Sequence, residues 1–192
     1  MTALMTAPPL AGADRALYWS LRRFWRVCGC RRDSRLVIMA IGIAMQSERI
    51  IEIEFGSDLM REAFGLRYEV FVDEQGVPRE LEVDELDPSA THLVAISGDR
   101  VIGTLRILDH GAAAKVGRVA VRATARRGGI GARLMHRAAA IAADRGFTEV
   151  IVHAQIAVVG FYRRLGYVEE GEEFDDAGIP HIAMRKKIVR SN

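Results

Sequence analysis

A basic, glycine-rich turn at Arg126–Gly131 separates two different sequence patterns. Before it, Val119 to Val121 is a short, apolar, β-branched run typical of a buried strand. After it, apolar residues recur at helical spacing, beginning with Leu134 and Ala138. The first N–H groups of a helix have no internal partner and lie at the positive end of its dipole. Glycines let an anion approach the backbone, so the turn is suited to bind a phosphate.

The spacing of the turn excludes two common phosphate loops. A Walker loop would continue into Gly-Lys-Ser/Thr, and a dinucleotide loop would read Gly-x-Gly-x-x-Gly. Neither pattern is present; the spacing here is Arg126-x-x-Gly129-x-Gly131. An ordinary glycine-rich turn between a strand and a helix would also fit these residues, so the rest of the chain has to decide.

The composition is typical of a globular chain with one main domain, at 27% charged and 49% hydrophobic residues. The net charge of +2 is uneven, because the first 35 residues carry a net +5 and leave −3 for the remainder. A mildly acidic body disfavours a nucleic-acid surface. Cys28 and Cys30 are too few for a zinc site. We therefore expect no metal, and a reducing, cytoplasmic location.

Residues 1–47 differ from the rest and are predicted to be a poorly ordered appendage to a domain at 48–190. Aromatic and leucine residues at helical spacing alternate with arginines over 15–26, and an apolar run follows at 36–45. Such a basic amphipathic segment could also contact a membrane surface. No apolar run approaches the roughly 18 residues that span a bilayer. Met45 is a plausible alternative start of the chain.

Periodicity in the body predicts the order β, α, three antiparallel strands, α, β, α, β, β. The expected strands are 49–55, 92–97, 100–108, 116–121, 148–154, 167–174 and 181–187. The first expected helix begins at Asp58, after a Ser57 cap, and two further helices are expected over 131–145 and 157–165. A mixed α/β layer protein follows from this order. The acidic stretch Glu80, Glu82, Asp84, Glu85 and Asp87 fits either a solvated loop or an anionic patch that attracts a cationic amine.

Several motifs in this order resemble the GNAT superfamily of acyl-CoA-dependent N-acetyltransferases. The turn matches its Gln/Arg-x-x-Gly-x-Gly/Ala loop, and Phe161-Tyr-Arg-Arg-Leu-Gly-Tyr167 is similar to its Phe-Tyr-x-x-Leu-Gly-Phe/Tyr helix. Four further segments together look like the ElaA/YjcF branch: 67–75 (Arg-Tyr-Glu-Val-Phe-Val-Asp-Glu-Gln), Asp84-Glu85-Leu-Asp87, His153-Ala-Gln155 and Gly178-Ile-Pro-His181. The resemblance covers about 48–188. It implies a central, mostly antiparallel sheet whose middle strands splay apart, flanked by helices.

The resemblance also implies acetyl-CoA as co-substrate, an amine as acceptor, and in many members a homodimer. The pantetheine arm would pair with the strand before the loop, and the pyrophosphate would bind the loop and the first helical turn. The implied cofactor-binding residues are Val119, Ala120, Val121, Arg126, Arg127, Gly128, Gly129, Ile130, Gly131 and Ala132.

The family motif implies that Tyr162 protonates the departing coenzyme A thiolate. The alternative is a tyrosine that only packs between helices. The amine must lose a proton before it attacks, and the candidates for the base are Glu74, Glu82, Asp84, His153 and His181. Each histidine has a purely structural alternative, and the sequence does not rank the five.

Two other functions fit the same scaffold. The chain could be a non-catalytic acyl-CoA-binding or sensor module. The Arg67–Gln75 segment also resembles acyl-homoserine-lactone synthases, which use this fold for another acyl transfer, although no surface for an acyl carrier protein can be identified.

Overall fold

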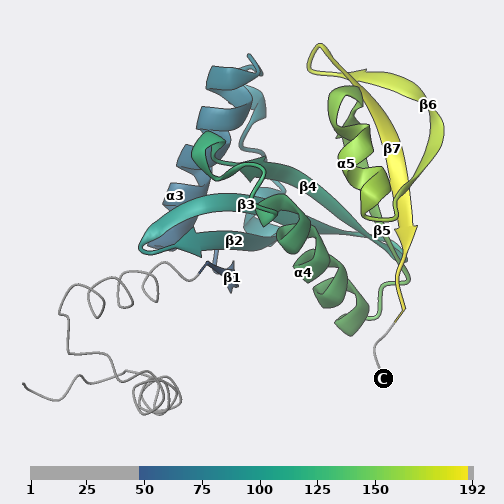
Figure 1. Cartoon of the computed structure of the whole chain (residues 1–192), viewed down its shortest axis with the longest axis horizontal. Helices are drawn as coiled ribbons and strands as arrows, with labels where there is room; N and C mark the ends of the chain where they lie inside the picture. Colours follow the sequence, from purple (N-terminus) through teal and green to yellow (C-terminus); the bar gives the residue numbers. More distant parts are fainter. Residues whose placement is uncertain (1–47, 190–192) are drawn as a thin grey trace, which may run out of the picture. The chain divides into compact units, whose positions relative to one another are not determined.

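A seven-stranded mixed sheet forms the centre of the structure, a computed structural model that describes residues 48–189 (Figure 1). The expectations for 1–47 lie outside the described residues. The sheet order is β1-β2-β3-β4-β5-β7-β6, and three α-helices flank it. The strands are β1 Arg49–Ile53, β2 Thr91–Ser97, β3 Arg100–His110, β4 Ala113–Val121, β5 Glu149–Gln155, β6 Val168–Asp176 and β7 Ile179–Lys187. The helices are α3 Asp58–Arg67, α4 Ile130–Asp144 and α5 Val159–Arg164.

The predicted order of elements is confirmed, but several boundaries were wrong. β1 ends at Ile53, because Glu54 to Ser57 forms a hydrogen-bonded turn. β4 begins at Ala113, so the turn expected over 109–115 is reduced to two residues. The connection between β6 and β7 is also only Ala177-Gly178, both at positive φ as a tight hairpin requires. Short turns leave longer strands to line the middle of the sheet.

The two middle strands separate part of the way along their length. β4 and β5 are parallel neighbours, but they pair only where Ala113–Val116 faces Glu149–Val152. Beyond Val116, β4 continues to pair with β3, while β5 pairs with β7 up to Gln155. Figure 1 shows the resulting V, with β1–β4 and α3 on one arm and β5–β7 with α5 on the other. The backbone of Gly117–Val121 therefore has no strand partner on the edge that faces β5.

A bulge in β4 lies at the point where the strands part. Gly117 pairs with Arg106 and Ala120 with Thr104, so two residues of β4 face one residue of β3. Arg118 takes a φ of 53°, which is unusual for a residue with a side chain. Bulges bend a strand and increase its twist, which fits the divergence from β5.

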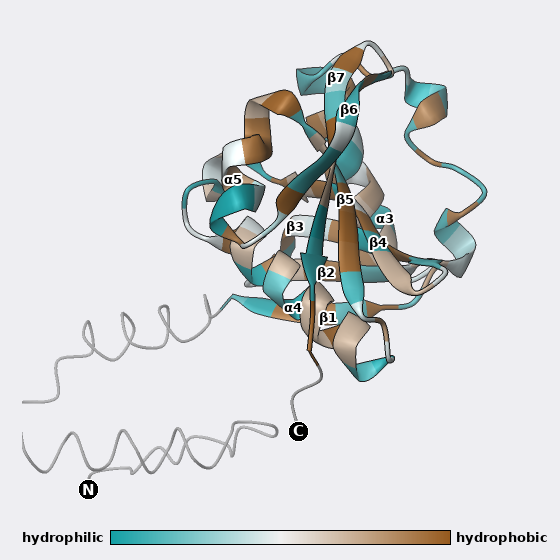
Figure 2. Cartoon of the chain, turned by 90° about the vertical axis from the view of Figure 1, so that its right-hand side faces the viewer, coloured by the Kyte–Doolittle hydropathy of each residue, from teal (hydrophilic) through white to brown (hydrophobic). Residues whose placement is uncertain are grey.

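The core lies on both faces of the sheet. One cluster packs beneath α4 and α5 and includes Leu134, Met135 and Val150, and a smaller one packs beneath α3. In Figure 2 hydrophobic colour runs along β5, whereas the end of β7 is hydrophilic. Gly103 of β3 lets α4 approach closely, since a Cβ there would lie 2.9 Å from Ile130 Cγ2. This contact fixes the first residue of α4 against the sheet.

The first helix changes character near its end. Ser57 caps α3 as predicted, because its hydroxyl accepts a hydrogen bond from the Met60 N–H at 3.2 Å. From Tyr68 to Glu74 the helix continues as a π-helix, which the sequence pattern did not predict. Apolar spacing such as Leu66 to Val70 does not distinguish the two helix types, and π segments occur often at functional sites. The π-helix carries Glu74 toward the glycine turn.

Candidate active site

A cleft of about 540 Å³ opens beside the splayed strands. It is lined from the π-helix, from the segment 77–86, from β3 to β5, from α5 and from the β6–β7 turn. His153, His181 and Tyr162, three of the residues proposed from sequence, line it together. Glu82, Asp84, Val119 and the splayed part of β4 also contribute, whereas Glu74 and the glycine turn do not. The structure thus brings all the candidates for proton transfer except Glu74 to one cavity, and the glycine turn lies outside the lining of that cavity.

The glycine turn leads directly into α4. Arg127 and Gly129 have φ values of 65° and 80°, and Gly129 is the N-cap of the helix. Gly129 has no side chain to accept a hydrogen bond, so it leaves the N–H groups of the first turn without a side-chain cap. A Cβ on Gly131 would lie 3.4 Å from the Phe161 ring, so this glycine lets α4 and α5 approach each other. The turn therefore presents free helical N–H groups near the splay.

Arg126 differs from the expectation in one respect. The backbone N–H of Arg126 donates to Ala123 O at 3.3 Å, so this N–H group is not available to a pyrophosphate. Its side chain donates from Nε to Val121 O at 2.9 Å and from Nη2 to Glu74 Oε2 at 2.6 Å. Arg126 thus holds the end of β4 and the end of the π-helix together. Glu74, a candidate base, is paired with this arginine.

Glu74→Gln is expected to tighten acetyl-CoA binding, with Kd falling by about two- to fivefold, the worth of an exposed ion pair. The carboxylate is paired with an arginine of the proposed phosphate loop, and its charge repels a phosphate. Isothermal titration calorimetry with acetyl-CoA measures the change. The matched control is Asp73→Asn, because Asp73 forms no ion pair with another described residue. Weaker binding in Glu74→Gln, or an equal gain in the control, would contradict this assignment.

Tyr162 lies in the wall of the cleft and is 6% exposed. Its ring packs edge-on against Phe161 and Tyr167, with centroid distances of 4.9 Å and 5.7 Å. Burial raises the pKa of the Tyr162 hydroxyl to about 12. The phenol therefore stays protonated at neutral pH, as a proton donor must. Packing and donation are compatible here, so the two sequence interpretations of Tyr162 do not exclude each other.

Two histidines face the cleft on either side of Phe174. His153 packs edge-on at 4.9 Å between centroids, and His181 stacks at 5.9 Å. His181 Nδ1 lies 2.8 Å from Ile179 O, so Nδ1 carries the proton and Nε2 is left able to accept one. Burial lowers the pKa of His153, and the nearby Lys115 lowers it further. The His153 imidazole is thus neutral and able to take a proton, and the hydrogen bond at Nδ1 leaves Nε2 as the acceptor atom of His181.

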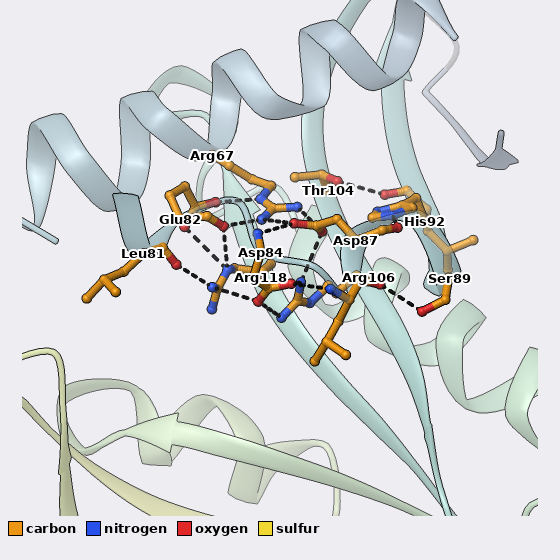
Figure 3. A network of polar contacts seen from close by, with 12 residues as sticks. Arg67, Leu81, Glu82, Asp84, Asp87, Ser89, His92, Thr104, Arg106 and Arg118 are labelled. Atoms are coloured by element: carbon orange, nitrogen blue, oxygen red, sulfur yellow. Dashed lines mark hydrogen bonds and ion pairs between the residues drawn. The ribbon is translucent and has the colours of Figure 1, made fainter. Parts of the chain in front are cut away.

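The acidic stretch is neither a solvated loop nor an anionic patch, and both interpretations were wrong for its central residues. Glu82 is 1% exposed and Asp87 is 0% exposed, and both bind Arg67 of α3. Arg67 Nε donates to Glu82 Oε1 at 2.5 Å, and Nη1 donates to Asp87 Oδ1 at 2.7 Å. Two further arginines complete a buried network (Figure 3). Glu82, Asp84 and Asp87 are thus neutralised from within the protein, whereas Glu80 and Glu85 remain exposed.

The other two arginines of this network come from neighbouring strands. Arg106 of β3 binds both oxygens of Asp84, at 2.6 Å and 2.7 Å. Arg118, the bulge residue of β4, donates to Leu81 O at 2.8 Å and to Glu82 O at 3.1 Å. Three arginines thus face three carboxylates. The network ties the segment 81–87 to the bulge, so it positions one wall of the cleft.

The two carboxylates bound by Arg67 have pKa values that shift in opposite directions. Burial raises the pKa of Glu82, and the charge of Arg67 does not outweigh it. Burial also acts to raise the pKa of Asp87, but hydrogen bonds from Arg67 and from the Asp84 N–H lower it to about 2. Asp87 thus accepts a backbone hydrogen bond in addition to those from Arg67, and each of them favours its charged form. Neither acid, enclosed in this way, is free to serve as the base.

Sequence reasoning missed Arg106, Arg118 and Lys115, which all line the cleft. Arg106 lies between the buried residues Leu105 and Ile107, and a charge inside an apolar run is a signal for a buried ion pair. Lys115 was placed in a turn that the structure shows to be strand. Within residues 48–189, no group of His, Cys, Asp and Glu is arranged to hold a metal ion. No helix of that part is long and apolar enough to cross a membrane.

The fold, the splayed strands and the glycine turn before α4 define a class of acyltransferases. The model of the acetyltransferase (GNAT) domain family matches residues 53–188, so the chain belongs to this family. It is an acyltransferase of the N-acetyltransferase type, as predicted, and its acceptor is unidentified.

Three similar proteins place the chain within the family. YjcF of Bacillus subtilis, named an uncharacterised N-acetyltransferase, is 40% identical over 128 residues, which are 66% of this chain and 91% of YjcF. ElaA of Escherichia coli is 28% identical over 66% of this chain and 86% of its own. The crystal structure of an acyl-CoA N-acyltransferase from Pseudomonas aeruginosa has a TM-score of 0.66 and 34% identity, over 73% and 99% of the two chains. The predicted ElaA/YjcF branch is confirmed.

Proposed function

We propose that this protein transfers the acetyl group of acetyl-CoA directly to a primary amine, with Tyr162 as general acid. The observation that carries the proposal is the buried Tyr162 in the wall of a cleft that opens where β4 and β5 separate. A pantetheine arm between these strands would bring a thioester to the same cavity. The unpaired edge of Gly117–Val121 that faces β5 supports this path, because its backbone groups can bind an amide-containing chain.

The first turn of α4 is the proposed pyrophosphate site. Its N–H groups, together with Arg127, would bind the phosphate oxygens, and Arg126 would hold the turn in place through Val121 O. Val119, Ala120 and Val121 would face the pantetheine arm, and a β4 N–H near Val121 would bind the thioester oxygen. Gly128, Ile130, Gly131 and Ala132 complete the proposed site as its close-approach backbone.

The chemistry requires one proton acceptor and one proton donor. The acceptor arrives as R–NH₃⁺, and a base removes one proton to give the amine. The nitrogen attacks the thioester carbon, a C–N bond forms and the C–S bond breaks. The thiolate takes its proton from the Tyr162 hydroxyl, and the second nitrogen proton restores that hydroxyl through solvent. The proton held by the base is then released. The products are the N-acetylated amine, coenzyme A thiol and one released proton.

We assign the base to His181 because its Nδ1–H is anchored on Ile179 O, which presents Nε2 as the proton acceptor. His181→Gln is expected to lower kcat about 100-fold, the typical contribution of a positioned base. His153→Gln is the matched comparison, since His153 lines the same cleft without this anchor. A release assay for the coenzyme A thiol measures both. A larger loss of kcat in His153→Gln than in His181→Gln would assign the general base to His153.

Acetyl-CoA binding and thiol release together test the proposed function. Calorimetry should show a 1:1 complex with acetyl-CoA, and thiol release should depend on an added amine. Binding without release for any amine would favour a sensor module. No binding would remove the pyrophosphate and pantetheine sites from consideration.

A further inference from the structure

Lys115 occupies the floor of the cleft. It lies in β4, opposite Leu108 of β3 and Ile151 of β5. Its neighbours Ala114 and Val116 belong to the core beneath α4, so alternation along the strand points Lys115 to the other face. His153 follows Ile151 by two residues and therefore shares that face. Lys115 is half-buried and lines the cleft, and its side chain makes no ion pair or hydrogen bond with the other described residues.

The charges around Lys115 favour an anion. Arg67, Arg106 and Arg118 are matched by Glu82, Asp84 and Asp87, so this buried network supplies no net negative charge to the cleft. Arg106 keeps one buried donor, Nε, without a partner among residues 48–189. Burial lowers the pKa of Lys115, and the charges of Arg106 and Arg118 lower it further. A bound carboxylate would relieve this repulsion.

Negative and apolar groups occupy other parts of the cleft. Glu80 and Asp176 are exposed lining residues, and only Asp176 opposes the repulsion on Lys115. Leu81 and Leu86 also line the cleft, with exposed fractions of 51% and 46%. Side chains of this size are usually covered when a ligand is bound. The cleft thus combines the Lys115 cation, the carboxylates of Glu80 and Asp176, the second of which acts on that cation, and apolar surface at the 77–86 wall.

We propose that the acceptor is an amino acid with an apolar side chain, whose carboxylate binds Lys115. Glu80 and Asp176 would attract its ammonium group, and Leu81 and Leu86 would contact its side chain. This inference rests on the proposed function and narrows its acceptor. It narrows the expectation of a cationic amine, because three of the acids that suggested one, Glu82, Asp84 and Asp87, are neutralised by arginines.

Matched acceptors test the role of the carboxylate. Coenzyme A thiol release is measured with acetyl-CoA and each proteinogenic L-amino acid, its amide, and, for leucine, 3-methylbutan-1-amine. The variants are wild type, Lys115→Met and Lys115→Arg. The control is Lys187→Met, because Lys187 is exposed on β7 and does not line the cleft. The acetyl-CoA-induced shift in melting temperature is recorded for each variant, as a check on folding and on coenzyme binding.

We expect release with apolar amino acids and little with their amides. Lys115→Met should raise KM for the amino acid about 10- to 100-fold, the worth of a charge-assisted hydrogen bond. The acetyl-CoA-induced shift in the melting temperature of Lys115→Met should equal that of wild type. Lys115→Arg should keep part of the affinity for the amino acid, and Lys187→Met should have the KM of wild type.

Equal activity with amides and acids, or an unchanged KM in Lys115→Met, would overturn the inference while leaving the acetyltransferase intact. Failure of every amino acid, with acetyl-CoA still bound, would also overturn it. If acetyl-CoA itself does not shift the melting temperature, the proposed function fails first.

Discussion

Tyr162→Phe is expected to lower kcat by about two to four orders of magnitude while acetyl-CoA affinity stays within about twofold. The substitution removes one hydroxyl and keeps the ring that packs against Phe161 and Tyr167. A thiolate that leaves without a proton donor is a poor leaving group in a buried site. Steady-state kinetics of thiol release, together with calorimetry, separate the loss of turnover from a loss of binding.

Tyr167→Phe is the matched control for this prediction. Tyr167 is 3% exposed, and its hydroxyl is buried without a hydrogen-bond partner among residues 48–189. Removal of that hydroxyl costs no hydrogen bond within these residues, so kcat should stay near the wild-type value. A Tyr162→Phe enzyme with half of its activity, or an equal loss in Tyr167→Phe, would show that the Tyr162 hydroxyl is not the acid.

The pH profile gives an independent view of the same group. The pKa of Tyr162 is raised to about 12, so the protonated form persists well above neutral pH. The pKa of His153 is lowered, so its imidazole is already neutral there. We expect activity to rise with pH as the acceptor amine loses its proton, with no change from His153 above neutral pH and no decline from Tyr162 up to roughly pH 10.

Arg67→Met is expected to destabilise the fold by about 3–5 kcal/mol, which corresponds to a fall in melting temperature on the order of 10 °C. The side chain is 1% exposed and holds Glu82 and Asp87, which would remain buried without this partner. Breaking one partner of a buried pair leaves an uncompensated charge, which costs more than the pair contributed. Urea denaturation followed by far-ultraviolet circular dichroism measures the free energy of unfolding.

Arg61→Met provides the comparison on the same helix. Arg61 pairs with Asp58, but its side chain is 71% exposed, so the loss should stay below about 1 kcal/mol. Arg67→Lys should fall between the two, since it keeps the charge and loses the fork that reaches two carboxylates. A loss below about 1 kcal/mol in Arg67→Met would mean that the network contributes little to the fold.

Local signals in the sequence were sufficient for the order of elements and for the glycine turn. Strand and helix periodicities depend on neighbours a few residues apart, and so do the Ser57 cap and the turn before α4. The motif around Tyr162 is equally local. These features are determined by short stretches of chain, which is why the family and the fold could be predicted before the structure.

Tertiary structure alone decided the roles of the charged residues. Glu82 and Asp87 meet Arg67 across 15 and 20 positions, and Arg118 reaches Glu82 across 36. No local pattern records such pairing, so the sequence of a buried network fitted a solvated loop or an anionic patch equally well. Lys115 faces the cleft only because β4 starts at Ala113 and parts from β5 after Val116. Strand pairing over long separations fixes these positions, and the proposed acceptor chemistry depends on them.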